Sequence, residues 1–344
     1  MEHTRKISTP QKIPFNISKV LVSASFDVSG IKNLTYLTLE SSLGNTSKIW
    51  SFEDQQDNKW IIKKYPKWSQ KEDVFWIHKY MNLLHEKGYP LSIHRGQPVE
   101  IDGHMFAVYE YAKGVQFDSN NTKHLREMAI GLKDLHDFSS DLVIEGARNW
   151  PVVADFKPDI CFLDTFDLGI LANEVEIKRI KILIIQAYKI ITSIFKLSQK
   201  KTTPIHGDYR TKNIKFSSMG ISKVFDFGNA RNDCLEADIT LTLNDLHAVY
   251  LNGDWKEKQK EFLSIYNEHG HISKVIPEFI YGSGLTLLTR ESIYLIKEYI
   301  HTSRRELLAD LERVISELEF QLNNLHLQMN MFEEVFSKSK YSII

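Results

Sequence analysis

The stretch P-I-H-G-D-Y-R-T-K-N-I-K-F, from Pro204 to Phe216, decides the fold of this 344-residue chain. It places Asp208 directly after a His-Gly pair and Asn213 five positions later. A second stretch, V224-F-D-F-G-N-A230, places Asp226 thirteen positions after Asn213. An aspartate can accept a hydroxyl proton, and carboxylate and amide oxygens are suitable ligands for Mg²⁺. This combination indicates phosphoryl transfer from a nucleotide. The alternative is that these Asp and Asn residues only form turns, which both residue types favour.

These two motifs resemble those of the aminoglycoside phosphotransferase and choline kinase superfamily, and the resemblance spans roughly residues 34–250. Protein kinases have H-R-D at the first motif, whereas this chain has H-G-D, which is similar to the small-molecule branch. The resemblance implies a protein-kinase-like fold that uses ATP and Mg²⁺. It also implies that Asp208 is the catalytic base and that Asn213 and Asp226 hold the metal.

The resemblance extends upstream to W60-I-I-K-K-Y65, which is similar to the strand that carries the phosphate-binding lysine. We expect Lys63 to have this role rather than Lys64. Neighbouring residues of a strand point to opposite faces, so that only one of the two can reach the phosphates.

V108-Y-E-Y-A-K-G114 is similar to the hinge of these enzymes, which implies that backbone groups of Glu110 to Ala112 pair with adenine. S41-S-L-G-N-T-S47 stands where the phosphate-covering loop belongs. Such a loop can offer backbone N–H groups and hydroxyls to phosphate. The residues expected to do so are Ser41, Ser42 and Gly44.

The resemblance also implies a glutamate that pairs with the lysine from the following helix. Its position falls near His78 or Lys79, neither of which is acidic. The helix has two glutamates, Glu72 and Glu86, and Glu72 is the candidate.

The first part of the chain has strand-like alternation and the remainder is mostly helical. The expected strands are 34–40, 48–53, 60–65 and 105–111. The expected helices are 72–86, 122–137, 174–198 and nearly everything from Asn244 onward. Strands followed by helices favour an α+β fold. We therefore expect a small antiparallel-sheet nucleotide-binding lobe over residues 1–111 and a larger helical lobe with the acceptor site over 112–344.

Composition excludes several classes of protein. The 43 basic and 44 acidic residues give a net charge of −1, which offers no general case for nucleic acid or an anionic membrane as partner. The start of the chain has no apolar signal core. The Ile-rich stretch 180–195 carries too many polar residues to span a bilayer. Two cysteines, Cys161 and Cys234, form no disulfide framework. A cytoplasmic protein is the expectation.

Two further patterns leave alternatives open. Apolar residues from Leu308 to Phe336 alternate steps of three and four, like a heptad seam. The seam could form a homodimer or dock on the large lobe, and docking is favoured. Four acidic residues after the D-F-G turn could attract a cationic acceptor or mark a helix start. They are Asp233, Glu236, Asp238 and Asp245.

The acceptor is expected to be a small hydroxylated molecule. The chain passes quickly from Gly228 into 238–245, without the long activation segment of protein kinases. The resemblance implies a hydroxyl on an amino-bearing antibiotic or related metabolite, with antibiotic resistance by phosphorylation as one outcome. The alternatives are a kinase for homoserine, choline or a sugar, and a kinase-like binding or spore-coat-type scaffold protein without catalysis.

Overall fold

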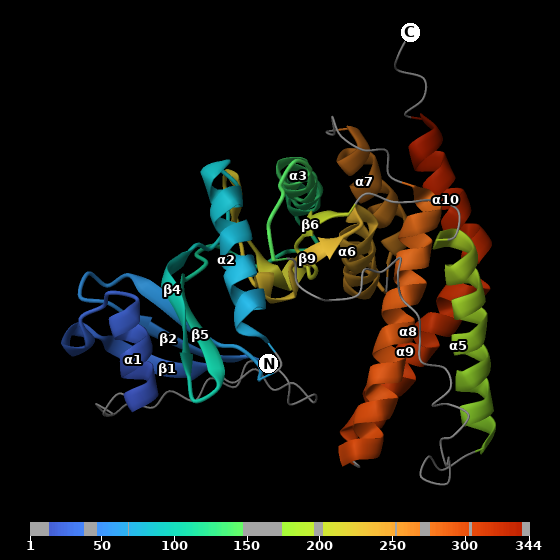
Figure 1. The fold of residues 1–344 in the computed structure, drawn as a ribbon. Coiled ribbons are helices and arrows are strands. Elements are labelled where there is room, and N and C mark those ends of the chain that lie inside the picture. Colours follow the sequence, from blue (N-terminus) through green and yellow to red (C-terminus); the bar gives the residue numbers. More distant parts are fainter. Residues whose placement is uncertain are drawn as a thin grey trace. The chain divides into compact units, whose positions relative to one another are not determined.

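A computed structural model shows the fold of the chain (Figure 1). The structure describes residues 14–37, 47–67, 69–146, 174–195, 202–251, 253–268, 276–302 and 305–338. The chain divides into two compact units. The first comprises Met1–Asp118, Leu142–Arg148 and Lys212–Arg231. The second comprises Ser119–Asp141, Asn149–Thr211 and Asn232–Ile344.

The first unit contains a five-stranded antiparallel sheet with the order β1-β2-β3-β5-β4. Its strands are β1 (Lys32–Leu37), β2 (Lys48–Glu53), β3 (Lys59–Lys64), β4 (His94–Ile101) and β5 (His104–Glu110). The described parts of the four expected strands are confirmed. β4 was not expected, because its sequence H-R-G-Q-P-V-E-I contains both glycine and proline. Asp102 and Gly103, both with positive φ, form the turn that pairs it with β5.

Two helices cover opposite faces of this sheet. Successive side chains of β5 alternate: Phe106 packs with the core that contains α1 (Phe15–Ser23), and Ala107 packs with Val74 of α2 (Lys71–Glu86). The short helix η1 (Val28–Gly30) follows α1. The helix expected over 72–86 is confirmed as α2.

The remainder of the first unit is a hairpin that carries the D-F-G turn. It consists of β7 (Ile214–Ser217), β8 (Gly220–Val224) and the helical turn η5 (Phe227–Asn229). The Val224 amide donates to Pro90 O at 2.7 Å, and the Val115 amide donates to Phe216 O at 2.9 Å. These bonds hold the hairpin on the segments that flank the large sheet.

The second unit is helical, with one two-stranded sheet of β6 (Thr203–Ile205) and β9 (Arg231–Asp233). Its described helices are α3 (Thr122–Ser139), α5 (Glu174–Phe195), α6 (Leu235–Val249), α7 (Trp255–Glu268), α8 (Pro277–Thr302), α9 (Glu306–Asn323) and α10 (Leu325–Lys338). The helices α5, α6, α9 and α10 all contact α8. The expectation of a small antiparallel sheet followed by a helical region is confirmed, although α6 begins nine residues earlier than expected.

The C-terminal seam is divided between two helices. α9 ends at Asn323 and α10 begins at Leu325, so the pattern is not one continuous coiled-coil helix. Leu311, Leu318 and Phe332 are 4%, 0% and 3% exposed, and both helices pack on α8 of the same chain. The described part of the seam therefore docks within its own unit, which is the favoured alternative.

Candidate active site

The first unit brings the predicted lysine and the D-F-G aspartate together. Lys63 lies on β3 between Ile49 of β2 and Ala107 of β5, and its side chain is largely buried. Its Nζ lies 2.6 Å from Oδ1 of Asp226. The Lys64 ammonium lies on the other side of the sheet, over the ring of Phe106. The structure thus pairs Lys63 with the predicted metal residue, 163 positions away along the chain.

The local backbone explains how Asp226 is presented. Its φ of 64° and ψ of 55° are left-handed, a conformation that Asp tolerates better than most residues. Gly228, the glycine of the turn, allows the lysine to approach. A Cβ at position 228 would lie 2.8 Å from Lys63 Nζ and 3.2 Å from Asp226 Oδ1.

Asn213 lies beside the same turn. It ends the helical turn η4 (Thr211–Asn213), it is 4% exposed, and its carbonyl accepts from the amide of Phe225 at 3.0 Å. An amide and a carboxylate oxygen fit the preference of Mg²⁺, which usually completes its coordination with water and phosphate oxygens. The described residues contain no cluster of three or more His, Cys, Asp or Glu side chains suited to holding a metal unaided.

Asp208, the predicted catalytic base, belongs to the second unit. It is 5% exposed, and its carboxylate pairs with the guanidinium of Arg210. Its amide donates to Nδ1 of His206 at 3.2 Å, which gives this histidine a structural role. Four residues of chain separate Asp208 from Asn213.

A buried carboxylate of α6 anchors the loop that carries Asp208. The amides of His206 and Gly207 donate to the two oxygens of Asp238 at 2.8 and 2.7 Å. Burial alone would raise the pKa of Asp238, but hydrogen bonding and charge from His136 and His206 hold that pKa below its usual value. Asp238 is therefore an ionised group that fixes the loop that carries Asp208.

Two more residues of α6 continue this contact. Thr242 Oγ1 donates to Tyr209 O at 2.8 Å, and the Thr211 amide donates to Asp245 Oδ2 at 2.7 Å. The spacing 238, 242, 245 places all three side chains on one face of the helix. Of the four acidic residues left open by the sequence, Glu236 and Asp238 lie in the first turn of α6, as a helix start requires. The polar i, i+4, i+7 spacing was the signal that could have revealed this anchor.

The predicted hinge residues lie at the end of β5. The Glu110 amide donates to Ile93 O at 2.9 Å, its carbonyl accepts from Ser92 Oγ, and its carboxylate pairs with Lys223. Ala112 follows the strand end. Both stay predicted adenine contacts. The predicted phosphate-loop residues Ser41, Ser42 and Gly44 lie outside the described residues.

At the place where a glutamate was expected, α2 presents a buried histidine. His78 is 2% exposed, and its Nε2 lies 2.7 Å from the hydroxyl of Tyr109. Glu72 lies in the first turn of α2, and its pairing with Lys63 stays a prediction.

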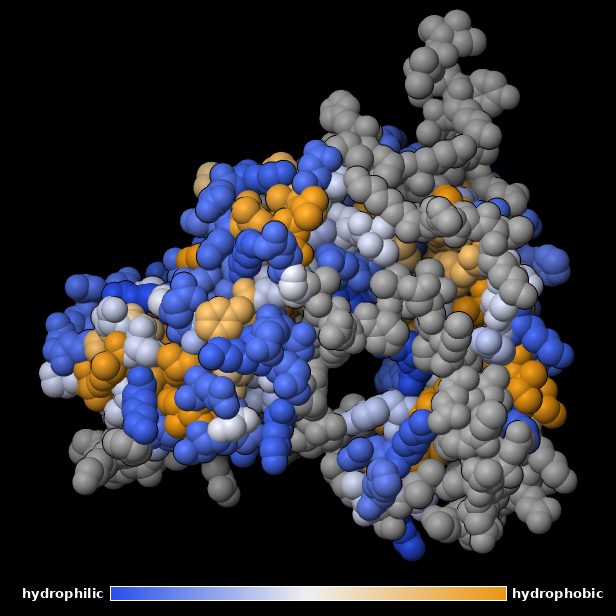
Figure 2. Space-filling view, viewed as in Figure 1, coloured by the Kyte–Doolittle hydropathy of each residue, from blue (hydrophilic) through white to orange (hydrophobic). Residues whose placement is uncertain are grey.

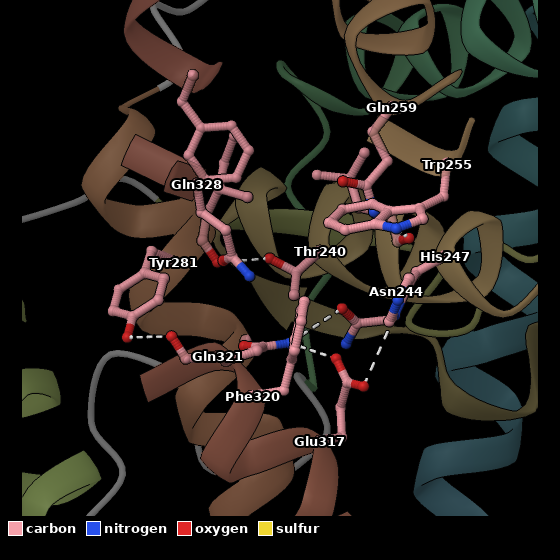
Figure 3. Close-up of a pocket in the computed structure, with 14 residues that line it drawn as sticks. Thr240, Asn244, His247, Trp255, Gln259, Tyr281, Glu317, Phe320, Gln321 and Gln328 are labelled. Atoms are coloured by element: carbon pink, nitrogen blue, oxygen red, sulfur yellow. Dashed lines mark hydrogen bonds and ion pairs between the residues drawn. The ribbon is translucent and has the colours of Figure 1, made fainter. Parts of the chain in front are cut away.

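A small cavity in the second unit lies among helices α6 to α10, with a free volume of about 30 Å³ (Figure 3). The His247 ring stacks on Phe320 at 5.4 Å and lies 4.6 Å from Trp255. Glu317 Oε2 lies 3.6 Å from His247 Nδ1, and Gln321 Nε2 donates to Glu317 Oε1 at 3.3 Å. Sequence reasoning missed this arrangement of rings around a carboxylate, because its members come from three helices.

The cavity and the loop that carries Asp208 both contact helix α6. Asn244 and His247 of α6 line the cavity, and Asp245 between them binds the amide of Thr211. α6 therefore supports the loop that carries Asp208 with one set of side chains and lines the cavity with another.

None of the described helices combines the length and the apolar character needed to cross a membrane. In Figure 2 the viewed surface mixes hydrophilic side chains with separate hydrophobic patches.

Comparisons with known proteins give a consistent result. A model of the phosphotransferase enzyme family matches residues 39–254. No similar sequence was found among curated proteins.

Several solved structures share the fold over nearly their whole length. One is the amicoumacin kinase hAmiN in complex with AMP-PNP and Ca²⁺, at a TM-score of 0.66 and 13% identity, covering 90% of this chain and 94% of that one. A microcompartment-associated aminopropanol kinase has a TM-score of 0.62 and 15% identity, with 91% and 98% covered. The spectinomycin phosphotransferase APH(9)-Ia, with ADP and spectinomycin, has a TM-score of 0.61 and 13% identity, with 92% and 99% covered.

Proposed function

Because the chain belongs to the phosphotransferase enzyme family, we propose that it transfers the γ-phosphoryl group of ATP to a hydroxyl of a small molecule. The observation that carries the proposal is the 2.6 Å pair of Lys63 and Asp226, which joins the strand lysine to the D-F-G turn. An ion pair of this kind keeps both groups in place until a nucleotide supplies phosphates for the lysine.

In this proposal each residue has one task. Lys63 binds phosphate oxygens of the nucleotide, and backbone groups near Ala112 bind the adenine. Asn213 and Asp226 hold Mg²⁺, which supplies positive charge that neutralises the phosphates. Asp208 orients the acceptor hydroxyl. It takes the hydroxyl proton as the oxygen bonds to the γ-phosphorus and the bond to the β–γ bridging oxygen breaks.

The acceptor that we propose carries an amino group beside its hydroxyl. Kinases of the same fold act on aminopropanol and aminoglycosides. Phosphorylation of an antibiotic would confer resistance.

The test is ADP release from Mg-ATP over a panel of amino alcohols, aminoglycosides, sugars and other antibiotics, with Asp208→Ala in parallel. We expect one acceptor class to stimulate turnover in the unmutated protein and not in Asp208→Ala, whose nucleotide binding should persist. Near-normal turnover by Asp208→Ala would refute the assignment. Silence across the panel without nucleotide binding would favour a non-catalytic scaffold.

The amino group is tested separately with pairs of acceptors that differ only in that group. The KM of the amine acceptor should be about tenfold or more below that of its analogue without the amine, the value of a charged hydrogen bond. Equal KM values within such a pair would show that the protein does not bind the amine.

A further inference from the structure

A chain of hydrogen-bonded rings leads from helix α2 to the strand that carries Lys63. His78 Nε2 lies 2.7 Å from the Tyr109 hydroxyl, and that hydroxyl is hydrogen-bonded to the hydroxyl of Tyr65. The three residues come from α2, from β5 and from the position directly after β3. His78 and Tyr65 at its two ends are 2% and 3% exposed, and Tyr109 between them is partly buried.

This series of hydrogen-bonded rings ends beneath the ammonium of Lys63. Lys63 Nζ lies 5.0 Å from the centre of the Tyr65 ring, which is within the range of a cation–π contact. The two residues are two positions apart and the Tyr65 amide donates to Met105 O at 2.8 Å, so they share one face of the extended strand. The hydrogen bond between the two hydroxyls holds the ring of Tyr65 in this position.

His78 is suited to this place because it is uncharged. Burial, the nearby His94 and the Lys63 ammonium hold the pKa of His78 well below its ordinary value. Its ring stacks on that of His94 at a centroid distance of 3.9 Å. An imidazolium here would repel the ammonium of Lys63, whereas the neutral ring holds Tyr109 without adding charge.

We propose that His78 is a positioning residue, which acts through Tyr109 and Tyr65 to hold Lys63 where it binds the phosphates of the nucleotide. This inference rests on the proposed function. Asp226 pairs with Lys63 but is also a predicted metal ligand, and a metal would draw its carboxylate away. The ring of Tyr65 supports the lysine without engaging a metal, so its contact can persist when nucleotide and Mg²⁺ bind.

The experiment measures the Kd of Mg-AMP-PNP by calorimetry, with the melting temperature of each variant recorded. His78→Leu removes the imidazole and should weaken binding about three- to tenfold, the value of one buried hydrogen bond. His78→Gln places an amide near the position of Nε2 and should restore most of the affinity. His85→Leu is the control, because it removes an exposed histidine of the same helix and should leave Kd unchanged.

Tyr65→Phe tests the same chain without emptying the core, since it removes one hydroxyl and keeps the ring. Tyr65→Phe should also raise the Kd. The loss of binding free energy in the double variant with His78→Leu should be smaller than the sum of the two single losses, because both substitutions break the same series of hydrogen bonds.

Each outcome decides the inference. Equal Kd values for His78→Leu and the unmutated protein would overturn it. A His78→Gln protein that keeps its melting temperature but binds as weakly as His78→Leu would also overturn it. His78 would then act by the shape of its side chain and not by its hydrogen bond. An unmutated protein that binds no nucleotide would instead refute the proposed function, and this inference would fall with it.

Discussion

Replacing Asp238 by alanine should release the loop that carries the predicted catalytic base. The amides of His206 and Gly207 donate to its carboxylate at 2.8 and 2.7 Å, and all three residues are buried. Each buried donor left without an acceptor costs about 1–3 kcal/mol, which gives about 2–6 kcal/mol for the pair. Removal of a buried charge relieves part of this cost, so we expect about 3 kcal/mol. That is a large fraction of the roughly 5–15 kcal/mol that stabilises a domain.

The assay is urea unfolding followed by circular dichroism. With a slope of about 3 kcal/mol per molar urea, the midpoint should fall by about 1 M. Asp238→Asn keeps one acceptor oxygen, so its urea midpoint should fall by about half as much as that of Asp238→Ala. Glu312→Gln is the control, because Glu312 is an exposed residue of α9 in the same unit.

The same variant distinguishes the role of the loop in turnover from the predicted role of the first unit in nucleotide binding. Asp238→Ala should lower turnover more than it weakens nucleotide binding, because Lys63 and Asp226 pair within the first unit. An Asp238→Ala midpoint equal to that of Glu312→Gln would refute the anchoring role. Loss of nucleotide affinity in proportion to turnover would refute the separation.

Three further predictions concern the first unit. Asp226→Asn should weaken Mg-AMP-PNP binding more than metal-free AMP-PNP binding, because it removes the charged metal ligand; equal losses in calorimetry would contradict this. Gly228→Ala should keep the fold but raise the Kd for Mg-AMP-PNP, because its methyl group would lie 2.8 Å from the flexible end of Lys63; an unchanged Kd would argue against the close approach. Burial, His94 and Lys63 lower the pKa of His78 from 6.5, so the unfolded chain binds this proton more tightly. Stability should be full above 6.5 and fall as pH drops below it, by at most about 1.4 kcal/mol per pH unit from His78. His78→Gln should flatten this slope in urea unfolding, and an unchanged slope would show that His78 does not cause it.

The elements that could be predicted were those with strong local patterns. The strand containing Lys63 is a short run of Trp and Ile that follows a polar turn, and α2 is an amphipathic helix that stops near Gly88, whose φ is 84°. β4 was missed because glycine and proline interrupt its alternation, and its pairing depends on β5 rather than on its own sequence. α1 was missed as well. Its core packing with residues of β2, β3 and β5 is a tertiary property.

The candidate site divides in the same way. Asp208, Asn213 and Asp226 could be singled out in the sequence because their motifs resemble those of a known family and their residue types suit phosphoryl transfer. Asp238 was noted only as one of four acidic residues, and its spacing with Thr242 and Asp245 is a weaker signal. An acidic residue at a helix start is common, and the partners of Asp238 are backbone amides 31 and 32 positions away. The cavity around Glu317 could not be predicted either, because its lining residues also lie far apart in the sequence.

The sequence by itself therefore determined the α+β order of elements, the motif residues and the choice of Lys63 over Lys64. These depend on local periodicity and on the chemistry that particular side chains can perform. The tertiary structure alone decided that Lys63 pairs with Asp226, that Asp238 holds the loop that carries Asp208, and that His78 stands where a glutamate was expected. Those relations join residues far apart in the chain, and a hydrogen bond or ion pair forms only where folding places its two groups within about 3 Å.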